Sequence, residues 1–186
     1  ADFVRAERLD PQIVPDAAED IDPDVFNRMD WSPCALAFIG GPHPANDPGI
    51  LRILDKDGIV ATFFAVGHRS VDYRIVLSAI ADAGHEIGIQ GFAGTPIVDL
   101  GHAGASADIA DGLEAVESAL APSTRQAGAN PDRDISLLLP DQASIDNIGI
   151  AAATAHGLRV LRWKSPVPGA SIRIAPGTVV LLSSGD

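Results

Sequence analysis

Residues 35–67, ALAFIGGPHPANDPGILRILDKDGIVATFFAVG, change from one hydrophobic pattern to another and back again. The run at 35–39 is short and apolar and is followed by Gly-Gly-Pro, which is typical of a strand that ends in a tight turn. Residues 47–57 then carry apolar side chains at helical spacing, and Gly58 supplies a stop signal. A second apolar run follows at 60–66. This stretch therefore predicts a strand, a helix and a second strand in succession.

The same alternation of patterns continues to the end of the chain. Strands are predicted at Ala35–Ile39, Val60–Val66, His85–Gln90, Ile135–Leu139, Leu158–Trp163 and Thr178–Leu182. Amphipathic helices are predicted at Asp47–Asp57, Val71–Ala83, Ala105–Ala121 and Ala143–His156. Strands that alternate with helices pair in parallel through right-handed crossovers, so the pattern predicts an α/β fold.

Composition and charge exclude several classes of partner. The 186 residues include 25 acidic and 13 basic side chains, and the net charge of -12 would repel nucleic acid and anionic membrane surfaces. Because no apolar run approaches the roughly 18 residues of a transmembrane helix, we expect no direct membrane insertion. Cys34 is the only cysteine, so the chain can form neither an internal disulfide nor a cysteine metal cage.

Two regions of the chain differ in composition. Residues 1–33 are acidic and contain four prolines, which predicts a mostly irregular arm that lies on the rest of the domain. The acidic residues of this arm lack the spacing of a calcium-binding loop, so a solvated surface is the better interpretation. Residues 34–186 carry all of the strand and helix patterns and are predicted to form one domain.

Three strings in the second region resemble the polysaccharide deacetylase, or NodB-homology, family. PGILRIL at 48–54 and ATFF at 61–64 match the family's first helix and second strand, and GHEIG at 84–88 matches a further family motif. The resemblance extends from Ala35 to Asp186 and implies a distorted (β/α) barrel of about seven units. The family usually continues with one more helix and strand. Because the sequence stops before them, either the chain was cut there or the barrel is left open at a seam that the N-terminal arm, a further domain or a partner chain would cover.

The resemblance also implies a chemistry, which is the metal-dependent removal of N- or O-acetyl groups from sugar polymers. The family binds a divalent metal through one Asp and two His, an arrangement that suits zinc with open coordination positions. A second Asp acts as the base, an Arg orients that base, and a late His acts as the acid.

At every one of these family positions the present chain carries a residue of another kind. Ile39 replaces the base, and Gly40, Gln90 and Gly94 replace the metal-binding Asp and the two metal-binding His. Leu138 replaces the Arg, Pro166 a late Asp, and Ser183 the acid His. Gly and Leu side chains neither bind a metal nor transfer a proton, and one neutral Gln amide does not hold zinc against water. We therefore expect no catalytic residue, no bound metal and no cofactor.

Several other side chains near the predicted site remain of interest. A residual ligand cleft would be lined by His43, Phe92, Asp141 and Trp163. Trp163 offers either a face on which a sugar can stack or a core side chain that closes the barrel. A rebuilt metal site would have to draw on His43, His68 and His102, although no H-x-x-x-H pair is present. His85 is predicted to be a packed histidine that bonds to the backbone.

The sequence predicts a catalytically inactive deacetylase-like domain that serves as a binding or scaffolding module in a larger envelope or polysaccharide-related protein. Its partner at the vestigial cleft would be another protein domain or a polysaccharide, and the apolar replacements favour a protein. The alternative is a metal-dependent carbohydrate N- or O-deacetylase with a rebuilt metal site. The resemblance implies an extracytoplasmic or cell-envelope location.

Overall fold

A mostly parallel sheet organises the part of the chain that can be described. The computed structural model describes residues 7–9, 34–121, 135–140, 145–161 and 178–184. Within these residues the strands are β1 (Glu7–Leu9), β2 (Cys34–Gly41), β3 (Thr62–Ala65), β4 (Glu86–Ile89), β5 (Leu137–Leu138), β6 (Arg159–Val160) and β7 (Thr178–Ser183). The helices are α2 (Asp47–Asp57), α3 (Gly67–Asp72), α4 (Arg74–Asp82), the 3-10 helix η1 (Ile97–Asp99), α5 (Gly101–Leu120) and α6 (Asn147–Ala155).

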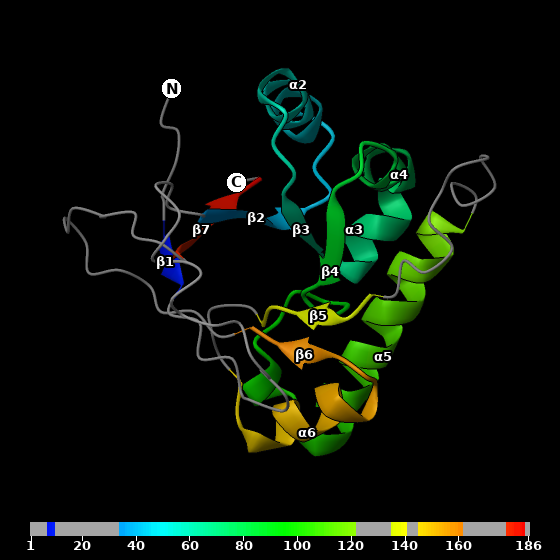
Figure 1. The fold of residues 1–186 in the computed structure, drawn as a ribbon. Helices are drawn as coiled ribbons and strands as arrows, with labels where there is room; N and C mark the ends of the chain where they lie inside the picture. The colour runs from blue at the N-terminus through cyan, green and yellow to red at the C-terminus, as the bar shows by residue number, and fades with distance from the viewer. Residues whose placement is uncertain (1–6, 10–33, 122–134, 141–144, 162–177, 185–186) are drawn as a thin grey trace.

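The strands form one sheet of seven in the order β1-β7-β2-β3-β4-β5-β6 (Figure 1). Every neighbouring pair from β7 to β6 is parallel, which confirms the predicted α/β class. Strand β1 pairs antiparallel with β7, so residues 7–9 of the N-terminal arm cover the edge that β7 would otherwise expose. Among the described residues no pairing joins β1 to β6, and the sheet is therefore not closed there.

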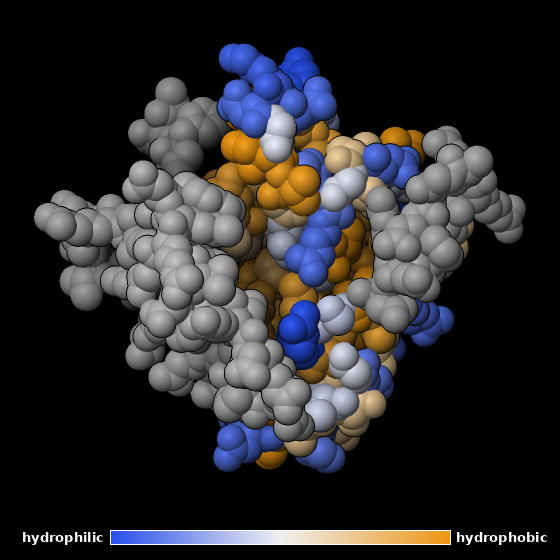
Figure 2. Space-filling view, in the orientation of Figure 1, coloured by the Kyte–Doolittle hydropathy of each residue, from blue (hydrophilic) through white to orange (hydrophobic). Residues whose placement is uncertain are grey.

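Alternate side chains of the strands pack into two separate apolar clusters, as the pleat of a strand requires. One cluster contains Phe38 and Phe63, whose rings stack 4.7 Å apart, together with side chains of α2, α4, α5 and α6. The other, which we call the inner cluster, consists of Ala37, Phe64, Leu137, Leu139 and Leu181, with Ile39 and Leu161 packed against it. Figure 2 shows apolar residues gathered in the middle of this view, below the polar surface of α2.

The helix boundaries agree with the sequence in one case and differ in three. Helix α2 has the predicted bounds, and Gly58 ends it in the left-handed conformation with φ 64°. The single helix predicted at 71–83 is instead two helices, because the backbone leaves the helical region at Tyr73. Helix α5 begins at Gly101, earlier than predicted. Helix α6 begins at Asn147, because Asp146 caps it by accepting a hydrogen bond from Gly149 N at 2.9 Å.

Most of the strands are shorter than the apolar runs that predicted them. Strand β5 occupies only residues 137–138 of the predicted run at 135–139, and β6 only residues 159–160 of the run that begins at Leu158. Residues 162–163 at the end of that run lie outside the described part. None of the helices in the described ranges combines the length and the hydropathy needed to cross a membrane.

Candidate functional site

Parallel strands bring their C-terminal ends to one edge of the sheet, and several of the predicted site residues lie along this edge. Ile39 and Gly40 lie near the end of β2, and Gln90 follows β4 directly. Ser183 ends β7 and is the register partner of Ile39. We call this edge the rim. The structure therefore brings together residues that are up to about 140 positions apart, as expected for a parallel sheet.

A hydrogen bond joins two of the positions to which the resemblance assigns the family's metal ligands. The backbone N–H of Gly40 donates to Oε1 of Gln90 over 2.6 Å. Gln90 is buried, and its own N–H donates to the carbonyl of Ala65 at 2.9 Å, which holds the residue against β3. The amide oxygen of Gln90 thus faces the backbone of β2.

These residues do not fit a divalent metal. A catalytic zinc site takes three protein donors and leaves a further position open. Gly40 and Gly94 have no side-chain donor, and the single amide oxygen of Gln90 already accepts the Gly40 N–H. Among the described residues no cluster of three or more His, Cys, Asp or Glu side chains is arranged to bind a metal.

The loop after β4, which carries Gly94, is held by a side chain that the sequence analysis missed. The carboxylate of Asp108 on α5 is buried and accepts hydrogen bonds from Phe92 N at 3.1 Å and Ala93 N at 2.9 Å. The sequence feature that could have indicated this contact is the acidic residue Asp108 on the apolar face of α5, next to Ile109 and one turn before Gly112. A buried carboxylate needs such donors, because its desolvation is otherwise costly.

Close backbone packing holds the same loop from the other side. Gly67 N donates to Gly91 O at 2.9 Å, and His68 N donates to Phe92 O at 3.1 Å. A Cβ at Gly67 would lie 2.8 Å from the Phe92 side chain and 3.0 Å from Cα of Gly112. The start of α3 is therefore fixed by tertiary packing against this loop and α5.

The structure places Leu138 away from Ile39. Leu138 is fully buried, pairs with Ile89 in register and belongs to the cluster that the helices cover. The next residue, Leu139, lies in the inner cluster with Ile39 packed against it. A side chain at 138 therefore packs toward the helices, and the assignment of the family's Arg position to Leu138 stays a prediction.

A buried polar cluster supports the rim below β2. Asp47, at the start of α2, is 0% exposed, and its Oδ2 accepts a hydrogen bond from His43 N at 2.7 Å. Ser184 Oγ donates to Ile39 O at 3.0 Å. Burial raises the pKa of the Asp47 carboxyl, and the nearby His43, Ser184 and Arg69 offset part of that rise. Asp47 thus anchors the turn after β2 through the backbone of His43, while the buried Nδ1 of His43 and Oδ1 of Asp47 have no hydrogen-bond partner among the described residues.

The remaining candidates are not brought together in the described part of the chain. His68 is exposed, and its Nδ1 lies 3.0 Å from Phe92 O, with the two rings edge to face at 6.4 Å. His102 is exposed near the start of α5. Asp141, Trp163 and Pro166 lie outside the described residues.

His85 is the packed histidine that the sequence predicts. It is 6% exposed, its Nδ1 accepts a hydrogen bond from Ala61 N at 3.3 Å, and its ring lies 5.2 Å from that of Phe63. Burial lowers the pKa of His85 from its usual value near 6.5, because the charged imidazolium is poorly solvated there.

This lowered pKa predicts acid sensitivity. Between the folded pKa and about 6.5 the unfolded chain binds more protons than the folded one, so the contribution of His85 to stability is lost as the pH falls through this window. The variant His85→Asn keeps an acceptor for Ala61 N but does not titrate. We expect its free energy of unfolding to fall less than that of the wild type when urea melts at pH 7.5 and pH 5 are compared. Equal losses in the two proteins would contradict the assignment.

Comparison with known proteins identifies the family. The polysaccharide deacetylase family profile matches residues 28–137, which is more than half of the chain. The chain therefore belongs to the polysaccharide deacetylase family.

Solved structures of several relatives share the fold. The peptidoglycan N-acetylglucosamine deacetylase Bc1960 is 22% identical, with a TM-score of 0.65 over 82% of this chain and 74% of that protein. A family 4 carbohydrate esterase from Streptomyces lividans is 20% identical, with a TM-score of 0.68 over 83% of this chain and 80% of its own. These likenesses confirm the predicted NodB-like fold.

A third solved structure with this fold is that of a pseudoenzyme. BA3943 from Bacillus anthracis, a CE4 family pseudoenzyme, is 18% identical, with a TM-score of 0.70 over 83% of this chain and 56% of that protein. A mutant of BA3943 with restored enzymatic activity matches with the same identity and TM-score. The present chain thus spans little more than half the length of BA3943.

Proposed function

We propose that this chain is a catalytically inactive polysaccharide deacetylase-like domain that serves as a binding or scaffolding module. The observation that carries this proposal is the hydrogen bond from Gly40 N to Gln90 Oε1. It links two positions at which the family, by resemblance, holds its metal. A site rebuilt for metal would direct that side-chain oxygen at the ion, whereas here it stabilises the backbone of β2.

The other family positions support the same proposal. Ile39 packs against the inner apolar cluster, and Gly94 has no side chain to offer. The same assignment gives Leu138, Pro166 and Ser183 in place of the Arg, the late Asp and the acid His. Replacement of one of these residues would be compatible with altered chemistry. Replacement of all of them removes the metal, the base and the acid together.

We infer that the rim binds another protein domain in preference to a sugar polymer. Ile39 and the half-buried Phe92 give the rim apolar surface, and the carboxylate of Asp47 is buried beneath it. A hydrated sugar needs paired polar groups and a stacking face, which apolar replacements do not supply. Apolar area of this kind suits the core of a protein interface.

The relatives suggest where such a module would act. Bc1960 is named for the deacetylation of peptidoglycan, and BA3943 is named as a pseudoenzyme whose mutant regains activity. By analogy, the chain would belong to an extracytoplasmic or cell-envelope protein concerned with polysaccharide, within which it scaffolds or docks and does not hydrolyse.

Titration of chitin, peptidoglycan and cellulose oligosaccharides into the domain tests this proposal. We expect no saturable binding up to millimolar sugar by calorimetry or NMR, and no acetate release with added zinc. Phe92→Ala is the matched variant at the described part of the rim, and Trp163→Ala removes the stacking face that one of the two interpretations of Trp163 would provide. Saturable binding that a folded Trp163→Ala variant loses would show a sugar-binding module instead.

A further inference from the structure

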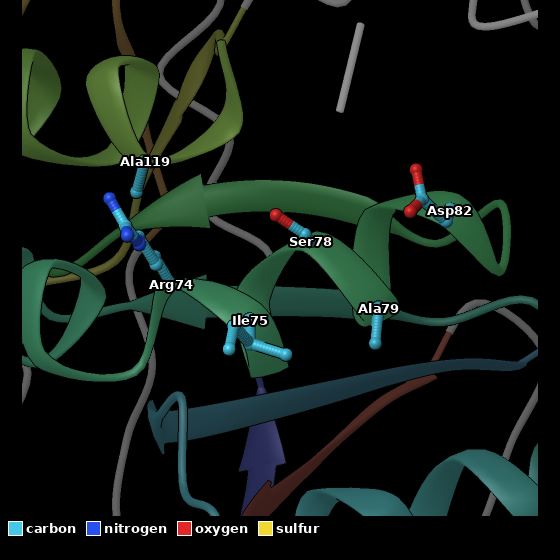
Figure 3. A pocket seen from close by; sticks show the side chains of 6 residues that line it. All are labelled: Arg74, Ile75, Ser78, Ala79, Asp82 and Ala119. Carbon is cyan, nitrogen blue, oxygen red and sulfur yellow. The ribbon is translucent and has the colours of Figure 1, made fainter. Parts of the chain in front are cut away.

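Helix α4 carries an exposed surface in which two rows of side chains border a groove of about 500 Å3 (Figure 3). The groove is lined by Arg74, Ile75, Ser78, Ala79 and Asp82 of α4 and by Ala119 of α5. One row consists of residues 74, 78 and 82, and the other of residues 75 and 79, because residues four apart are neighbours on a helix. Ile75 is 81% exposed, the highest value among the large apolar side chains that the structure describes.

The two charges of this surface lie at unfavourable ends of their own helix. Arg74 is the first residue of α4, where the helix dipole presents positive charge, and Asp82 is the last, where the dipole presents negative charge. Helix α4 has no acidic residue in its first turn and no basic residue in its last. Within the described ranges neither Arg74 nor Asp82 forms a side-chain ion pair that would compensate for this placement.

An antiparallel copy of the same helix would reverse both mismatches. In that arrangement Arg74 approaches the negative end of the second helix and its Asp82, while Asp82 approaches the positive end and its Arg74. A two-fold axis makes the two contacts identical and brings the two Ser78 side chains close to one another. We propose that this surface is an interface for a second copy of the chain, formed by antiparallel packing of α4 on α4.

The size and polarity of the side chains in the two rows fit a second copy of the helix. Ser78 and Ala79 are small, so two helices can approach closely at the centre of the contact. The pairing would also bury Ile75, and the hydrophobic effect favours its removal from water. The net charge of -12 opposes association of two copies, but physiological salt screens charges that lie more than a Debye length apart.

Sedimentation of the 186-residue chain in 0.15 M salt, from about 1 μM to about 1 mM, tests the proposal. We expect a reversible dimer. The reversals Arg74→Asp and Asp82→Arg each place like charges opposite one another, and each is expected to weaken association about tenfold or more. The double variant Arg74→Asp/Asp82→Arg restores opposite charges and is expected to recover most of the affinity. Ile75→Arg is expected to abolish the dimer.

Weaker association of the charge-reversal variants would not arise from a less stable monomer. Each single reversal places a charge at the helix end that the dipole favours, so the monomer is expected to be as stable as the wild type or more so. Arg52→Asp, an exposed change on α2, is the matched control and is expected to leave association unchanged. A chain that sediments as a monomer at every concentration would overturn the proposal, as would a dimer that is indifferent to Ile75→Arg and to both reversals.

A crosslinking experiment locates the axis independently. In a Cys34→Ser background, Ser78→Cys is expected to form an intermolecular disulfide readily under mild oxidation, because the two copies of position 78 meet at the two-fold axis. Ser118→Cys, an exposed position on α5, is the control and is expected to crosslink at least tenfold more slowly. Equal rates for the two variants would place the interface elsewhere and reject the antiparallel contact.

Discussion

The quadruple variant Ile39→Asp/Gly40→Asp/Gln90→His/Gly94→His is expected to bind one zinc ion per chain at the rim, where the wild type is expected to bind none. Strands β2 and β4 lie on either side of β3 in fixed parallel register. The 2.6 Å contact between Gly40 N and Gln90 Oε1 shows that positions 40 and 90 already approach each other. One Asp and two His would then provide the three protein ligands of an open zinc site.

The restored site is expected to be weaker than a native one. The residues that orient metal ligands in an active relative are missing, which typically lowers metal affinity by about 10 to 100-fold. Gly40 and Gly94 also have φ angles of 79° and 67°, in the left-handed region that residues other than glycine rarely adopt. A Cβ at Gly94 would lie an acceptable 3.4 Å from the Val66 side chain, so backbone conformation and not space is the obstacle there.

Metal content after dialysis, measured by mass spectrometry and followed by calorimetric titration, checks this expectation. The double variant Ile39→Asp/Gly40→Asp supplies carboxylates without imidazoles and is the matched control, which should retain no zinc. A folded quadruple variant without zinc would mean that the loops no longer hold the family geometry. Stoichiometric zinc in the wild type, lost in His43→Ala, would instead favour the alternative of a deacetylase with a rebuilt metal site.

Local sequence patterns predicted those parts of the fold that local forces determine. Helix α2 has its predicted ends, because its apolar spacing stops at a glycine that adopts the left-handed conformation. The break at Tyr73 was not predictable in this way, since the apolar spacing of residues 75–80 shows only that a helix is present. The start of α3 depends on how Gly67 packs against Phe92 and Gly112, which are distant in sequence.

The candidate site shows the same division. Sequence motifs located positions 39 and 40 on a strand, and position 90 at the end of another strand, that the structure brings to the rim. The bond between Gly40 and Gln90 could not be predicted, because it joins residues 50 positions apart. In the run Leu137–Leu139 every residue is leucine, so no alternation of polar and apolar side chains indicates which one faces the inner cluster. The contacts of Asp108 depended in turn on how α5 packs on the loop after β4.

The close approach of α5 to that loop leads to the last prediction, which concerns Gly112→Ala. In an open helix this change stabilises by about 1 kcal/mol, since alanine has the higher helix propensity. Here a Cβ at 112 would lie 2.6 Å from the carbonyl carbon of Gly91 and 2.8 Å from Phe92 N. Both are backbone atoms, and Asp108 and Gly67 hold this loop by hydrogen bonds, so it cannot easily retreat.

The clash is therefore expected to outweigh the propensity, and Gly112→Ala should lower the free energy of unfolding by about 2 kcal/mol, within the usual cost of overpacking. Urea melts check this as a lower midpoint at an unchanged slope. Gly49→Ala in α2 is the matched control: its Cβ would meet only the mobile end of Arg52 at 4.0 Å, so it should stabilise or have no effect. If Gly112→Ala were also stabilising, α5 and the loop could separate without cost, and the close packing between them would not fix the segment that carries Gly94.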